Sequence, residues 1–186
     1  MLKLLEKYDK AISIVVLIAS IALSISIFFI PLNPTDLATY GYGGVFVITL
    51  LGAATLFIPG PTMVATFVVG SLLNPLMVAL VAGLGSAIGE STGYAAGYAS
   101  RALITPKERN DTWYQRIFRW MGSHPFLTIF LLDAIPNFLG DIAGLIAGRN
   151  KYSYFKFLFA SFLGKTIRFG ISAYLGFGFA RFFWQK

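Results

Sequence analysis

The chain has 186 residues, of which 56% are hydrophobic and only 12% are charged, and its mean hydropathy is +0.72. This composition is too apolar for a soluble domain and predicts an integral membrane protein. The net charge of +7 does not indicate nucleic-acid binding, because Lys and Arg gather at segment ends and in one loop, as membrane orientation requires. The chain has no cysteine and one histidine, His124, so we expect no disulfide, metal centre or cofactor.

Residues 1–35 are expected to form an N-terminal tail and a first transmembrane helix. Residues 1–10 carry mixed charge, and Ala11 to Ile30 is a largely apolar run of about the length that one crossing needs. No Ala-x-Ala cleavage site follows before Pro31, so we expect this helix to be retained rather than removed as a signal peptide.

The next apolar run is broken in its middle. No charge occurs between Asp36 and Glu90, yet Phe57-Ile58-Pro59-Gly60-Pro61 interrupts the run, because the two prolines remove backbone donors and clash with the preceding turn. Each remaining piece is too short to cross about 30 Å of hydrocarbon. This pattern predicts a re-entrant helical hairpin, with a kinked spanning helix as the alternative. A clean span is then expected from Asn74-Pro75 to about Ala99.

A basic loop follows, from residue 101 to residue 124, with five basic and two acidic residues. Trp113, Ile117, Trp120 and Met121 recur in it at helical spacing. This spacing favours a short helix lying in the membrane interface, or a solvated connector with packed aromatic side chains.

The hairpin pattern then recurs. Phe126 to Ile135 and Ile142 to Gly148 are two short apolar pieces, separated by a break that includes Pro136 and Gly140. A last span is expected to follow and to end near Phe179.

The predicted fold is therefore all-α: an extra N-terminal transmembrane helix, then an inverted repeat of re-entrant hairpin plus transmembrane helix. Repeat one covers 40–100, the basic interfacial loop 101–124 and repeat two 125–180, within a membrane domain of 36–186. A hairpin and one crossing place the next repeat upside down, as in secondary transporters. A cytoplasmic N-terminus puts the basic loop inside. No organelle address is evident, so we expect the cell membrane.

Four glycines, Gly85, Gly89, Gly93 and Gly97, recur every fourth residue in the span before the basic loop. Such a stripe favours close contact between helices, with a substrate groove as the alternative.

Ionisable residues occur inside the predicted membrane segments. Glu90 lies about 22 Å into its span at 1.5 Å per residue, Lys165 and Arg168 lie similarly deep in the last span, and Asp133 and Asp141 flank the second break. Because an intramembrane charge costs roughly 3 kcal/mol or more, such groups pair with one another or line a watery path.

These charges support two interpretations. In the functional one, Lys165 and Arg168 bind an anionic group in a polar cavity at the hairpin tips, aided by helix N-termini. The acids Glu90, Asp133 and Asp141 then balance charge or carry protons. In the other, the same residues form internal salt bridges without a substrate.

The motifs of the chain, taken in order, resemble the DedA/VTT family (SNARE-associated or vacuole-membrane-protein-like) of membrane proteins. They are Phe57-Ile58-Pro59-Gly60-Pro61, Gly85-Ser86-Ala87-Ile88-Gly89-Glu90-Ser91-Thr92-Gly93-Tyr94, Ile135-Pro136-Asn137 through Asp141-Ile142-Ala143-Gly144, and Gly164-Lys165-Thr166. The resemblance implies two opposed re-entrant hairpins and a role in moving lipids, as scramblases in eukaryotic relatives and undecaprenyl-phosphate carriers in bacterial ones. Bacterial relatives tend to have an acid at the position of Pro61, and arginines where this chain has Asp133 and Leu139.

We therefore expect a lipid translocator that acts on lipids with anionic phosphate head groups. No nucleophile, base and orienting group stand at recognisable spacing, so no enzyme activity is expected. The alternatives are a proton-coupled carrier of a small solute and a non-transporting scaffold for membrane assembly; protons and a homo-oligomer stay open as partners. The expected pathway residues are Glu90, Asp133, Asn137, Asp141, Lys165 and Arg168, with hairpin breaks at Pro59, Gly60, Pro61, Pro136 and Gly140.

Overall fold

The computed structural model describes Val15, Ile18 and residues 40–54, 60–103, 119–135 and 140–184. In this part of the chain all regular structure is helical and no strand occurs, which confirms the all-α prediction. Apart from Val15 and Ile18, which are helical and exposed, the expected first transmembrane helix lies outside the described residues. So do residues 104–118 of the basic loop and the break residues Pro59, Pro136 and Asn137.

The first half of the described chain, residues 40–103, contains four helices. Helix α3 (Gly41–Ala54) and helix α4 (Gly60–Leu72) are each about 20 Å long at 1.5 Å per residue, on either side of the predicted break. Pro61 lies in the first turn of α4, where backbone N–H groups have no acceptor within the helix, so the N–H that proline lacks is not required. Helix α5 (Pro75–Gly89) follows and is capped at its N-terminus by Asn74. The Asn74 side chain accepts hydrogen bonds from the N–H groups of Leu76 and Met77 at 3.0 and 3.3 Å.

The predicted span from Asn74 to Ala99 is helical but contains an interruption. Pro75–Ala99 is the one stretch of the described residues that is long and apolar enough to cross a membrane. A turn at Glu90 divides it into α5 and helix α6 (Ser91–Leu103). The Thr92 hydroxyl donates to Gly89 O, 3.1 Å away, and so contacts a carbonyl of the helix backbone beside this turn. Helical hydrogen bonds nevertheless continue through the turn, because Glu90 N–H donates to Ser86 O at 3.0 Å and Tyr94 N–H donates to Glu90 O at 3.1 Å. The span expected from the sequence is therefore confirmed.

The second half, residues 119–184, begins with a helical turn at 119–123 and contains three further helices. Helices α8 (Pro125–Ala134) and α9 (Gly140–Arg149) match the second pair of short apolar pieces. Helix α10 (Tyr154–Trp184) has 31 residues and is about 46 Å long. It continues five residues past the expected end at Phe179.

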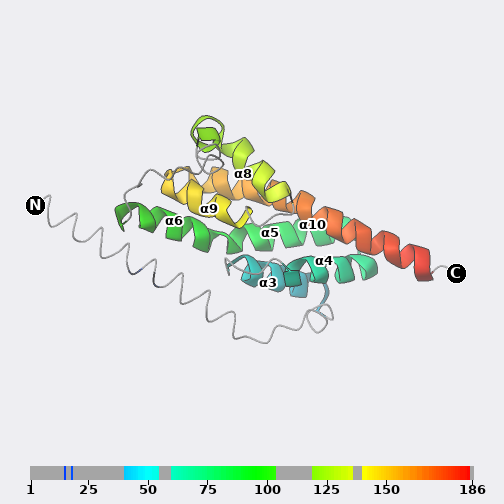
Figure 1. Ribbon diagram of the computed structural model, residues 1–186. Helices are drawn as coiled ribbons and strands as arrows, with labels where there is room; N and C mark the ends of the chain where they lie inside the picture. The colour runs from blue at the N-terminus through cyan, green and yellow to red at the C-terminus, as the bar shows by residue number, and fades with distance from the viewer. Residues whose placement is uncertain are drawn as a thin grey trace, which may run out of the picture.

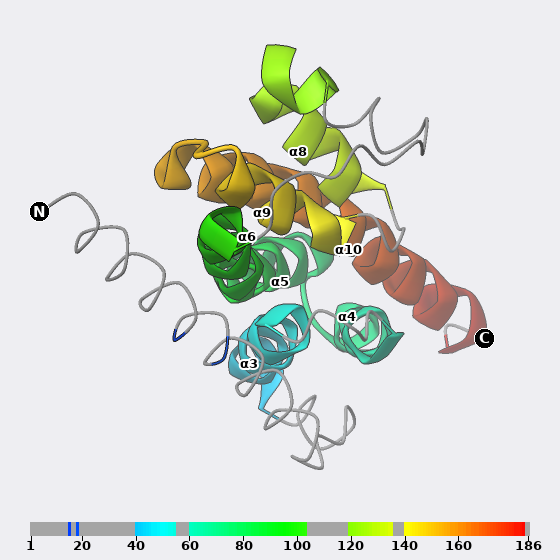
Figure 2. The same ribbon diagram turned by 60° about the vertical axis from the view of Figure 1, so that its left-hand side comes forward.

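Helix α10 packs against both pairs of short helices. It contacts α4 and α5 from the first half and α8 from the second, while α3 packs on α5 and α9 packs on α6. In Figures 1 and 2, α3 and α4 therefore lie on one side of α5 and α10, and α8 lies on the opposite side.

Two apolar clusters fill the contacts between these helices. The first joins α3, α4, α5 and α10 through the side chains of Val45, Val69, Val78, Ala82, Phe169 and Ala173. The second joins the second-half helices through Met121, Ile129, Ile146, Ala147, Phe157 and Ala160. Met121, for which the sequence leaves an interfacial helix and a packed connector open, thus packs in the bundle, while Trp120 beside it is exposed.

The glycine stripe serves the close packing that the sequence predicted. The backbone of Gly89 lies directly against Leu50 O and Ala54 N of α3. The second half repeats this contact, because a β-carbon on Gly164 would lie 2.6 Å from Phe130 O and 3.1 Å from Ala134 N of α8. In both halves, a glycine of the long helical segment therefore contacts the C-terminal part of the first short helix of the pair.

We predict that Gly164→Ala destabilises the protein, because the added methyl group collides with backbone atoms of α8 that cannot move aside. Overpacking of this kind costs about 1–3 kcal/mol, which corresponds to roughly 2–12 °C in Tm for a chain of this size. Gly178→Ala on the same helix is the matched control, since nothing lies within 4 Å of a β-carbon there. Thermal unfolding of the purified variants in detergent measures both, and equal Tm values would contradict the packing role.

Candidate functional site

Four buried polar side chains follow one face of α10. Ser161, Lys165, Arg168 and Ser172 recur at intervals of four, three and four residues, which places them on the same side of the helix. All four are buried, and Lys165 is only 1% exposed. This polar face of α10 crosses from the neighbourhood of α8 to that of α4.

Glu90 is bound by three donors that all come from the second half of the chain. Its Oε1 accepts the backbone N–H of Gly144 in α9 at 2.9 Å, and its Oε2 accepts the hydroxyl of Ser161 at 2.6 Å. The ammonium of Lys165 lies 3.2 Å from the same Oε2. Glu90 itself is 1% exposed, so its charge is compensated by these donors rather than by solvent.

Lys165 bridges Glu90 to a second buried acid. Its Nζ lies 3.6 Å from Asp133 Oδ1 on α8, and the Asp133 side chain is fully buried. Removing one partner from such a buried arrangement leaves a charge without compensation, which is far more costly than the pair itself. We call Glu90, Asp133, Lys165, Ser161 and Gly144 the charge cluster.

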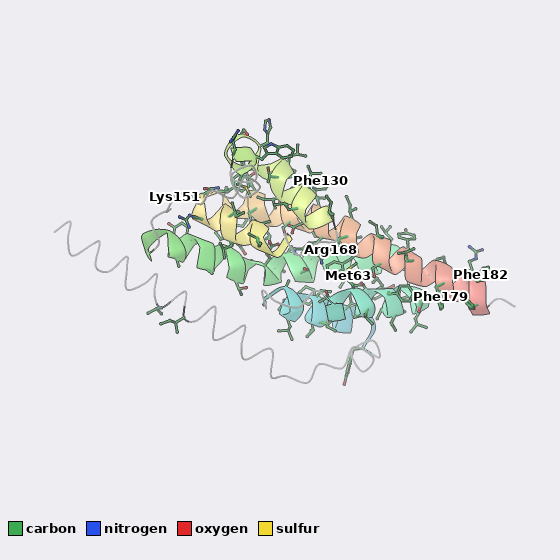
Figure 3. The ribbon with its side chains drawn as sticks, in the orientation of Figure 1. Met63, Phe130, Lys151, Arg168, Phe179 and Phe182 are labelled. Carbon is green, nitrogen blue, oxygen red and sulfur yellow. The ribbon has the colours of Figure 1, made fainter. Side chains whose placement is uncertain are left out.

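Arg168 lies on the same face but outside the charge cluster. It is 5% exposed, and its Nε has no hydrogen-bond partner among the described residues. One turn further along α10, the Ser172 hydroxyl donates to Met63 O, 2.8 Å away in the first turn of α4. Figure 3 labels Arg168 and Met63, which belong to two helices, α10 and α4, that pack against each other. Arg168 is thereby placed beside the start of α4.

Several expected site residues are thus brought together and others cannot be placed. Glu90, Asp133 and Lys165 form one cluster, and Arg168 follows it on α10. Gly60 and Gly140, which the sequence places in the breaks, are the first residues of α4 and α9, so both helices begin within the predicted break segments. The side chain of Asp141 and all of Asn137 lie outside the described residues.

Ser161 and Gly144 were not singled out from the sequence. The one available signal for Ser161 was its position four residues before Lys165, which places both on the same helical face. Gly144 contributes only a backbone N–H, which no residue pattern marks. Among the described residues, no three His, Cys, Asp or Glu side chains lie close enough to hold a metal ion.

Comparison with known proteins gives the same family as the sequence motifs. Residues 58–178, well over half of the chain, match the family model of the VTT domain. The chain therefore belongs to the VTT domain family, the DedA family of membrane proteins.

A curated relative is similar over a shorter stretch. Vacuole membrane protein KMS1 of Arabidopsis thaliana is 33% identical over 60 residues, which are 30% of this chain and 14% of that protein. The match thus spans a small part of the relative's length. No solved structure matches the chain.

We predict that Glu90→Gln lowers stability by about 3–5 kcal/mol, the usual cost of breaking a buried ion pair, because Lys165 loses its nearer carboxylate. Ser161→Ala is expected to cost less, about 1.5–3 kcal/mol, since it removes one hydrogen bond to a charged group. Lys156→Gln, at an exposed lysine of the same helix, is the control and should leave Tm unchanged. A Glu90→Gln variant as stable as Lys156→Gln would show that the charge cluster does not stabilise the fold.

Proposed function

We propose that this protein moves lipids across the bilayer, with the head group passing along the polar face of α10 and the acyl chains remaining in the membrane. The observation that carries this proposal is the set of ionisable side chains buried inside an apolar helical bundle. Charges inside a membrane protein are costly and are typical of substrate or ion pathways. Membership of a membrane protein family linked to transport and lipids supports the same conclusion.

We propose further that the two pairs of short helices are re-entrant hairpins. Helices α3 and α4 are about 20 Å long and α8 and α9 about 15 Å, whereas a crossing needs about 30 Å. The matching contacts of Gly89 with α3 and Gly164 with α8 support two structurally related halves. One crossing between the hairpins then inverts the second half relative to the first.

Movement of one half against the other would open the pathway. Glu90 belongs to the first half, and its three donors belong to the second, so separation at this point must break all three contacts. Such rocking of two halves around a central site is the usual mechanism of inverted-repeat transporters. Only binding and movement are required, and no covalent step, so we propose no enzyme activity.

The hairpin arrangement predicts which positions share a side of the membrane. Since the native chain has no cysteine, single cysteines can be introduced directly at exposed positions. Tyr40→Cys and Leu72→Cys, at the two ends of the first hairpin, should react from the same side, which we propose is outside. Ser123→Cys and Asn150→Cys should both react from the opposite, cytoplasmic side.

The measurement is labelling of intact cells, and of inverted vesicles, with a maleimide that does not cross membranes. Labelling of Tyr40→Cys and Leu72→Cys from opposite sides would show that α3 and α4 form a kinked spanning helix instead.

Lipid flipping in liposomes tests the function itself. The purified protein is reconstituted with head-group-labelled lipids, a quencher is added outside, and protein-free vesicles give the baseline. We expect rapid loss of the inner-leaflet signal with the wild type. Glu90→Gln should change the rate by roughly tenfold or more, because a change of about 1.4 kcal/mol in a barrier has this effect. Lys156→Gln should flip lipids as the wild type does.

Failure of all lipids to move, across neutral and anionic phospholipids and a polyprenyl phosphate, with and without a pH gradient, would overturn lipid translocation. A proton-coupled carrier of a small solute is the second candidate, because two buried carboxylates, those of Glu90 and Asp133, share the single ammonium of Lys165. That function requires solute uptake that depends on a pH gradient.

A further inference from the structure

The two buried cations of α10 have different surroundings. Lys165 has carboxylate oxygens at 3.2 and 3.6 Å, so its positive charge is compensated inside the protein. Both carboxylates attract this ammonium, which lies between them. A passing anion would have to compete with two carboxylates for this ammonium, and it would meet their negative charge in doing so.

Arg168 forms no ion pair with a carboxylate among the described residues. Its guanidinium carries five N–H donors, and its Nε makes no hydrogen bond in this part of the chain although the side chain is only 5% exposed. Burying an ion costs several kcal/mol unless an opposite charge or good hydrogen bonds offset the loss of water. A bound anion would supply both.

A helix N-terminus lies beside Arg168. Ser172, one turn along the same face, donates to Met63 in the first turn of α4, so the polar face of α10 meets α4 where that helix begins. Backbone N–H groups and the helix dipole make such an end favourable for oxyanions. Both features, the guanidinium and the helix start, thus favour an anion at the same place.

The depth of Arg168 is also informative. Lys156 and Arg181 are exposed cations near the two ends of α10, about 18 and 20 Å from Arg168 along the axis. If they mark the two membrane surfaces, Arg168 lies near the midplane, where an anionic head group is least stable in lipid.

We propose that Arg168 and the first turn of α4 bind the phosphate group of a lipid midway across the membrane, while Lys165 holds the two halves together and does not bind substrate. This inference rests on the proposed lipid translocation. Guanidinium is suited to the task because its planar donors bind phosphate oxygens in pairs, which an ammonium cannot do.

Binding is tested on the full-length protein in detergent with three probes: short-chain phosphatidic acid, the diacylglycerol with the same chains, and inorganic phosphate. We expect phosphatidic acid to bind and to raise Tm, and diacylglycerol to do neither. Inorganic phosphate should bind far more weakly. If it binds as tightly as phosphatidic acid, the site serves a soluble anion and the lipid assignment is wrong.

Three variants locate the site. Arg168→Gln should weaken phosphatidic acid binding by roughly tenfold or more, the loss expected for hydrogen bonds to a charged group. Arg168→Lys, which keeps the charge and serves if the first variant does not fold, should also weaken it, because paired donors are lost. Arg181→Gln, at an exposed arginine of the same helix, should bind as the wild type does. Unchanged binding in a folded Arg168 variant would overturn the inference.

The flipping assay separates this inference from the function on which it rests. Suppose that the wild type flips lipids and that Arg168→Gln does not flip them but binds phosphatidic acid as tightly as the wild type. Arg168 then acts on movement, and the proposed binding site is wrong. If phosphatidic acid binding depends on Arg168 but the wild type flips no lipid, the site stands and lipid translocation fails.

Discussion

The contact between the Glu90 carboxylate and its three donors is the interaction on which the arrangement of the helices depends. A carboxylate that is 1% exposed must be compensated by nearby protein groups, and Gly144, Ser161 and Lys165 have to arrive from two other helices to do so. Such proximity is attainable because the helices approach one another through glycines; a β-carbon on Gly144 would lie 3.0 Å from Glu90 Cγ. Charge compensation of Glu90 therefore depends on close packing, because its donors reach it only where the helices approach closely.

The same physical requirement gives the neighbouring cations different roles. Lys165 and Arg168 are three residues apart and share a helical face, so sequence alone treats them as one anion-binding pair. In the folded chain Lys165 lies between Glu90 and Asp133, whereas Arg168 follows where α10 meets the first turn of α4. Position relative to the acids, which depends on how α8 and α5 pack on α10, therefore decides what each cation can bind.

Much of this fold could be predicted because prolines and charges are strong local signals. Pro61 limits where α4 can begin, and the deep positions of Glu90 and Lys165 mark them as functional candidates whatever the packing. Other features depend on tertiary contacts. The Gly144 N–H reaches Glu90 only because α9 crosses α6, and the turn at Glu90 has no proline to reveal it. The sequence places the end of the last span near Phe179 because Arg181 follows, but the helix continues through Arg181 to Trp184, since a basic residue is common in the last turn of a helix.

The repeated glycine contact bears on how such a chain can have arisen. Glu90 directly follows Gly89, and Lys165 directly follows Gly164, so the two halves carry opposite charges after corresponding glycines. If the halves descend from one duplicated segment, identical copies would have brought two acids or two lysines together at the centre of the bundle, where like charges repel strongly. The observed pair requires the copies to have diverged at this position. A single chain, rather than a dimer of identical short proteins, is the simplest way to fix one acid opposite one base.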